Sequence, residues 1–230
     1  AWWGKLCDPI KEVLDEGFEK VSLNLYKLSA YLPVCKAMLD LGPEWLDKYV
    51  RTVLAESMYI ALEQAVIAGT IGMIKDLAGA VVDGVYPDKE ATAITDLDPA
   101  TLGAEIMAPL TNGGKRSVSN VIMIVNPLDY WSKVFPAITT RNASGEYVQS
   151  TAIPIRFIES TEVTVGTAVC GMAKDYFLGV GNTQKIQYSD EARFIEDERV
   201  YINKQYANGR PKANDSFLVF DISGIGVQTP

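Results

Sequence analysis

The last third of this chain contains six short runs of β-branched and aromatic residues, and it is the part that most restricts the fold. The runs cover residues 153–158, 163–170, 176–180, 185–188, 199–206 and 217–222. Such runs, bounded by turn residues, predict strands. An acidic stretch at 190–198 interrupts them, and Asn208-Gly209 predicts a tight turn after the fifth run. We therefore expect a sheet-rich C-terminal third with little catalytic chemistry between its strands.

The clearest helical signal lies earlier, over residues 43–68. Pro43 suits a first helical turn and Gly69 suits the position just past a helix end. Apolar residues recur between them at three- and four-residue spacing, which predicts one amphipathic helix. At 1.5 Å per residue this helix is about 38 Å long, which suits an elongated subunit.

Shorter elements are predicted on both sides of the long helix. We expect a helix at 8–17, a strand at 18–28 and a helix at 34–41. A second group is predicted further along: a helix from 98 to 110, a buried strand at 119–125, and a helix from Asn126-Pro127 to 135. Helix-rich, mixed and strand-rich segments in this order favour the α+β class.

Composition limits the function classes. The 230 residues are 48% hydrophobic and 22% charged, as in a folded protein with one sizeable core or two small ones. The net charge of −8 disfavours a large phosphate-binding surface. We expect no membrane span, because no apolar run approaches the required length. Three widely spaced cysteines without a CxxC pair indicate neither a zinc site nor a disulfide framework.

The chain has no histidine. This excludes Ser-His-Asp and Cys-His nucleophilic systems, histidine-ligated metals and imidazole acid–base catalysis. An enzyme built on this sequence would have to use carboxylates, lysine, tyrosine or cysteine. No motif indicates a cofactor or a metal: the residues 113–117 fail the phosphate-loop pattern, and Gly179-Val180-Gly181 lacks the third glycine of a dinucleotide site.

The acidic stretch is the one candidate for carboxylate chemistry. Paired carboxylates there could act in hydrolysis or hold a divalent cation. The alternative is a solvated face with Arg193 and Arg199 as local partners, and we favour it because charge runs usually face solvent. The acids concerned are Asp190, Glu191, Glu196, Asp197 and Glu198.

Four stretches, in order, resemble segments of tailed-bacteriophage major capsid proteins with the Hong Kong 97-like fold. FEKVSLNLYKLSAYLPVCKAML (18–39) resembles the second arm of the family's extended loop, and PEWLDKYVRTVLAESMYIALEQAVIAGT (43–70) resembles its spine helix. VIMIVNPLDYWSKV (121–134) resembles an axial-domain strand with its Asn-Pro helix start, and the strand-rich tail resembles the end of the subunit.

The resemblance implies an α+β shell subunit with axial and peripheral domains. The implied division is an N-terminal segment with an extended-loop remnant at 1–33, peripheral parts at 34–80 and 184–230, and an axial domain at 81–183. Little precedes Phe18, so we expect an N-terminally truncated or processed form, encoded by a phage or prophage.

The implied function is structural and not enzymatic: hexamers and pentamers of this chain would form an icosahedral head around double-stranded DNA. The implied partners are other copies and the phage's portal and scaffolding or protease proteins, in virions assembled in the bacterial host cytoplasm. An encapsulin-like compartment and, less favoured, a histidine-free carboxylate hydrolase are the alternatives. The expected subunit contacts, with no catalytic, cofactor or metal residues among them, are Val21, Leu23, Leu25, Tyr26 and the acids of the 190–198 stretch.

Overall fold

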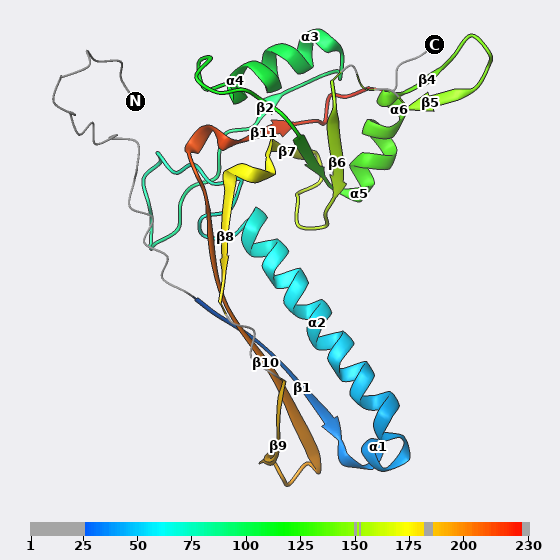
Figure 1. The fold of residues 1–230 in the computed structure, drawn as a ribbon, viewed down its shortest axis with the longest axis vertical. Helices are drawn as coiled ribbons and strands as arrows, with labels where there is room; N and C mark the ends of the chain where they lie inside the picture. Colours follow the sequence, from blue (N-terminus) through cyan, green and yellow to red (C-terminus); the bar gives the residue numbers. More distant parts are fainter. Residues whose placement is uncertain (1–25, 150, 152, 182–185, 227–230) are drawn as a thin grey trace, which may run out of the picture.

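The structure is a computed structural model that describes residues 26–149, 151, 153–181 and 186–226. It has a body in which two short helical segments pack on one face of a sheet, and a long arm built mainly from one long helix and a second sheet (Figure 1). The predicted α+β class is confirmed. The predicted helix at 8–17 lies outside the described residues, as does most of the predicted strand at 18–28.

The arm contains the long helix α2 (Pro43–Ile67), preceded by α1 (Lys36–Leu41). The predicted bounds of the long helix are confirmed to within one residue, with Ala68 as its C-cap residue. Leu46, Val50 and Leu54 are buried on one stripe of its N-terminal half, where they pack against Val34 and Tyr201 of the sheet. The helix therefore gains its stability there from an apolar stripe that recurs every four residues.

Four strands form the sheet of the arm: β1 (Tyr26–Cys35), β8 (Tyr176–Val180), β9 (Gln187–Arg193) and β10 (Glu198–Pro211). β10 is the central strand. It pairs antiparallel with all of β1 on one side and with β9 and then β8 on the other. β1 extends through Pro33, which pairs with Val200, so α1 begins two residues later than predicted. Proline is tolerated in β1 because this strand lies at the sheet edge.

The predicted Asn208-Gly209 turn is wrong. β10 continues through both residues, which pair with Gly179 and Leu178 of β8. A Cβ added at Gly209 would lie 2.7 Å from Cε1 and 2.8 Å from Oη of Tyr176. The glycine therefore leaves room for the Tyr176 ring over the strand, a contact that local sequence cannot indicate. The chain reverses instead at residues 194–197, between β9 and β10.

Five strands form the sheet of the body, in the order β2-β11-β7-β3-β6. All residues of β3 are buried, which confirms the predicted buried strand. One face of β3 packs into a core with the helical segments, and Ile122 and Ile124 on the other face pack with Ile67 at the end of α2. Burial on both faces explains its continuous apolar run. The strands are β2 (Thr92–Ala93), β3 (Val121–Val125), β6 (Ile155–Glu159), β7 (Thr167–Met172) and β11 (Phe217–Asp221).

The two helical segments predicted at 98–110 and 126–135 are present, the second extending to Ile138, and both pack on this sheet. The first is α3 (Pro99–Thr101), η1 (Leu102–Met107) and α4 (Ala108–Leu110); the second is α5 (Pro127–Asp129), η2 (Tyr130–Val134) and α6 (Phe135–Ile138). η1 and η2 are π-helical and each lies just before a proline, Pro109 or Pro136. Proline lacks the N–H of a regular helical hydrogen bond, and its ring crowds the preceding turn. The wider π-helical turn makes room for that ring. The second segment begins at Asn126, whose Oδ1 accepts a hydrogen bond from the Leu128 N–H at 3.0 Å.

A polar junction joins the two sheets at the short turns η3 (Ala173–Asp175) and η4 (Asn214–Ser216). The buried Asp175 carboxylate accepts a hydrogen bond from Arg116 Nη1 at 3.0 Å, and Arg116 Nη2 donates to the Asp215 carbonyl at 2.8 Å. Lys89 Nζ donates to the carbonyls of Asn214 and Phe217 at 2.7 and 2.5 Å. These bonds tie Arg116 and Lys89 of the body to the two turns where the chain passes between the sheets.

The predicted domain ranges stay predictions, and the sheets cross them at two places. β8 lies in the predicted axial range but pairs with β10 of the arm, and β11 lies in the predicted second peripheral range but pairs with β7 of the body. The remaining strands β4 (Thr139–Arg141) and β5 (Tyr147–Gln149) form a projecting hairpin. Among the described residues, no helix is both long enough and apolar enough to span a membrane.

Candidate functional site

Two surfaces at opposite ends of the arm are candidate contact sites. The first, which we call the tip, comprises residues 190–198 at the β9–β10 reversal. The Asp197 carbonyl accepts a hydrogen bond from the Lys36 N–H at 2.9 Å, and the Asp197 N–H donates to the Phe194 carbonyl at 3.3 Å. Phe194 and Ile195 are 74% and 95% exposed. The tip therefore holds two large apolar side chains in solvent on an anchored turn.

Most acids of the tip are paired within the chain. Arg199 donates two hydrogen bonds to Asp190, at 2.5 and 3.1 Å, and Arg193 donates to Glu198 at 2.7 Å. These contacts confirm Arg193 and Arg199 as the predicted local partners. The hydrogen bond from Arg199 lowers the pKa of Asp190 below its ordinary value.

Lys36 holds the tip from the neighbouring strand end. Its ammonium group lies 3.8 Å from the Asp197 carboxylate, donates to the Asp190 carbonyl at 3.4 Å, and lies 5.3 Å from the centre of the Phe194 ring. Among the described residues, Glu191 and Glu196 have no ion pair within 4.0 Å. Both residues are exposed, and the charge of Glu196 acts on Arg193 from beyond ion-pair distance.

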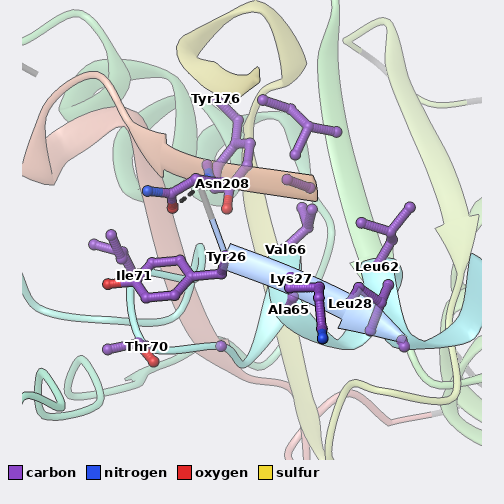
Figure 2. Close-up of a pocket in the computed structure, with 15 residues that line it drawn as sticks. Tyr26, Lys27, Leu28, Leu62, Ala65, Val66, Thr70, Ile71, Tyr176 and Asn208 are labelled. Atoms are coloured by element: carbon purple, nitrogen blue, oxygen red, sulfur yellow. Dashed lines mark hydrogen bonds between the residues drawn. The ribbon is translucent and has the colours of Figure 1, made fainter. Parts of the chain in front are cut away.

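The second surface is a groove of about 270 Å³, which we call the α2 groove, between the C-terminal end of α2 and strands β1, β8 and β10. The apolar stripe that packs on the sheet in the first half of α2 continues into this groove as Leu62, Ala65 and Val66. Figure 2 shows Tyr26 and Tyr176 at its sides, with Ile71 beyond the end of α2. Of the described residues that line it, Lys27 is the one that carries a charged side chain.

The predicted contact residues thus lie far apart in the structure. Tyr26 lines the α2 groove and is 67% exposed, whereas Asp190, Glu191, Glu196, Asp197 and Glu198 gather at the opposite end of the arm. Val21, Leu23 and Leu25 lie outside the described residues. Sequence reasoning missed the groove because four separate elements form it. Sequence reasoning also missed Phe194 and Ile195 as contact residues. Two apolar residues inside a charged stretch could have indicated exposed apolar side chains at this position.

The described part of the structure shows no cluster of side chains arranged for catalysis or metal binding. No group of three or more cysteine, aspartate or glutamate side chains is placed to hold a metal among those residues. Cys170 is buried in the core of the body, and this burial raises the pKa of its thiol. A thiol that stays protonated is a poor nucleophile. The two surfaces are therefore suited to protein–protein contact. The tip presents two apolar side chains beside acidic residues, and the α2 groove is apolar with one lysine among its described lining residues.

Comparison with known proteins identifies the fold. No family model and no curated protein sequence matches the chain. Among solved structures, the capsid of an empty GTA particle matches with a TM-score of 0.60 at 11% identity, over 86% of this chain and 72% of that one. A structure from Mycobacterium phage Che8 matches with 0.59 at 13% identity, over 94% and 81%.

A third match comes from outside the phages. The SrpI encapsulin complex from Synechococcus elongatus has a TM-score of 0.56 at 13% identity, over 90% of this chain and 77% of that one. The likeness covers the body and the arm together and not one sheet alone. At these identities it shows the fold, and it confirms the fold predicted from the sequence. The chain has the Hong Kong 97-like fold found in these phage capsid and encapsulin shells.

Proposed function

We propose that the chain is a structural shell subunit: many copies assemble into the icosahedral head of a phage. The observation that carries this proposal is the extent of the fold match, which covers 94% of the chain in the Mycobacterium phage Che8 structure. A shared fold alone hosts many functions. Here, however, similar structures from a GTA particle, from phages and from an encapsulin include several that are described as capsids or particles.

The contents and partners extend this proposal. The head encloses double-stranded DNA without gripping it, which a net charge of −8 permits because strong DNA binding needs many phosphate-neutralising cations. The chain then belongs to the virion, assembles in the bacterial host cytoplasm, and works with the portal and scaffolding or protease proteins of the same phage. An encapsulin-like compartment is the second candidate, favoured by the match to the SrpI complex.

The tip and the groove-lining Tyr26 are the proposed subunit contacts, with Val21, Leu23 and Leu25 as further candidates. A shell requires contacts between different patches of neighbouring copies. The acids of the tip suit such a contact better than hydrolysis. A general acid needs a raised pKa, whereas the pKa of Asp190 is lowered by its hydrogen bond from Arg199. We therefore expect no enzymatic turnover from this cluster.

Expression of the chain in a bacterium, followed by electron microscopy and nuclease treatment of purified particles, tests the proposal. Closed shells are expected. DNA protected from nuclease inside them supports the phage head, and a co-purifying enzyme without DNA supports the compartment. A chain that stays monomeric while it hydrolyses a substrate in a Glu196-dependent reaction overturns the shell proposal.

A further inference from the structure

We propose that the tip of one copy docks in the α2 groove of a second copy, with Ile195 as the apolar anchor. This inference rests on the proposed shell function and names one of its interfaces. The two surfaces belong to the same chain, and each exposes large apolar side chains: Phe194 and Ile195 on the tip, and Tyr26 and Leu178 in the groove.

The tip has the properties of a docking knob. Ile195 is 95% exposed and Phe194 74%, although burial of such side chains is strongly favourable. The turn that carries them is held by the Lys36 N–H on the Asp197 carbonyl and by the Asp190–Arg199 pair. An anchored turn loses little conformational entropy when it binds. Most of the free energy gained by burying Phe194 and Ile195 in a partner is therefore available for association.

The α2 groove is the complementary surface in shape and polarity. Its floor is the apolar stripe of α2. The sheet covers the first half of this stripe, whereas Leu62 is half-buried and Ala65 exposed among the described residues. A groove of about 270 Å³ can take one or two large apolar side chains. The groove and the tip therefore match as a concave apolar site and its anchor.

Charge complementarity selects this occupant over other apolar segments. Lys27 is the charged residue in the groove lining, and Glu191 and Glu196 flank the apolar pair of the tip without an ion pair of their own among the described residues. Docking would bring opposite charges together at the rim of the contact. Such pairs direct association and fix its register more than they add affinity.

The arm geometry makes the contact intermolecular. The tip is at residue 198 of β10 and the groove contains residue 209 of the same strand, a separation of about 36 Å at about 3.3 Å per residue. One copy cannot fold its own tip into its own groove. The contact is therefore head-to-tail, and a repeated heterologous contact closes into a ring when its rotation allows.

Disulfide trapping between two differently tagged chains tests the contact. In a Cys7→Ser, Cys35→Ser background, one chain carries Ile195→Cys and the other Ala65→Cys on the groove floor. Under mild oxidation we expect a disulfide-linked heterodimer, because docking brings the two Cα atoms into bonding range. The matched control replaces Ala65→Cys with Thr52→Cys, which is exposed on another face of the same helix, and we expect no heterodimer from it.

A charge exchange provides the second readout. Glu196→Lys or Lys27→Glu alone should weaken association about two- to fivefold, and the two together should restore it. Ile195→Ser should weaken association about 10- to 100-fold. Equal heterodimer yields from Ala65→Cys and Thr52→Cys, or no heterodimer while shells form, overturns the inference and leaves the shell proposal standing. Heterodimers in a protein that forms no shells support the contact and count against the shell.

Discussion

The path of β10 through Asn208-Gly209 gives the sharpest test of the fold, because local sequence predicts a turn there. If β10 continues, the Gly209→Ala methyl group meets Tyr176 Cε1 at 2.7 Å, Tyr176 Oη at 2.8 Å and the Phe177 carbonyl oxygen at 3.0 Å. Overpacking of this kind costs about 1–3 kcal/mol. Replacing a strand glycine by alanine stabilises the folded state by about 0.5–1 kcal/mol, because alanine loses less conformational entropy on folding. We therefore expect a net loss of up to about 2.5 kcal/mol in the free energy of unfolding.

A double-mutant cycle isolates the ring contact. Tyr176→Val removes the ring while it keeps a residue that favours strands. In that background Gly209→Ala should be neutral or stabilising, so the coupling between the two positions should be about 1–3 kcal/mol. Urea unfolding of the two single variants, the double variant and the parent chain measures it. Additive effects within about 0.3 kcal/mol would refute the reasoning and point to a turn whose residues do not contact Tyr176.

Three further predictions concern stability. Gly171→Ala should destabilise more than Gly209→Ala, with a total loss of about 3 kcal/mol, because its methyl group would meet the buried Phe217 ring and lie 2.6 Å from the Ser216 carbonyl oxygen; unchanged thermal unfolding would contradict the packing of β7 on β11. Leu54→Ala should cost about 2–5 kcal/mol, because Leu54 is 1% exposed between α2 and the sheet; a loss below about 1 kcal/mol in urea unfolding would place α2 off the sheet. Burial raises the pKa of Tyr176 to about 12, so its hydroxyl stays neutral in the folded chain when the unfolded chain ionises near pH 10. The contribution of the Tyr176 hydroxyl to the free energy of unfolding is unchanged below about pH 10 and becomes unfavourable as the pH rises toward 12, because the unfolded chain ionises first. Tyr176→Phe should therefore lessen the alkaline loss of stability by about 1–2 kcal/mol. Identical pH profiles of stability for the parent and the variant would argue against burial of this side chain.

The elements that sequence predicts well are those whose signal is local. α2 has a proline at its start, a glycine past its end and an apolar stripe between them, and its bounds follow from these. β3 is an uninterrupted apolar run, which predicts a buried strand. Asn126 followed by Pro127 is a typical N-cap and first helical residue, so the start of the next helix can also be predicted from the sequence.

The features that sequence misses depend on residues far apart in the chain. Asn208-Gly209 looks like a turn until the Tyr176 ring is known to lie over Gly209. Pro33 argues against a strand until β1 is known to be at the edge of its sheet. Of the candidate site, the acidic stretch was visible in the sequence, whereas the α2 groove arises only when α2 is placed against β1, β8 and β10.

Shell formation is the central claim, and electron microscopy of the purified chain tests it most directly. We expect closed particles of uniform size in whose subunits α2 packs on the four-stranded sheet and the end of α2 packs on the five-stranded sheet. A chain that remains monomeric by sedimentation at every concentration and salt condition, with its fold intact by circular dichroism, would contradict it.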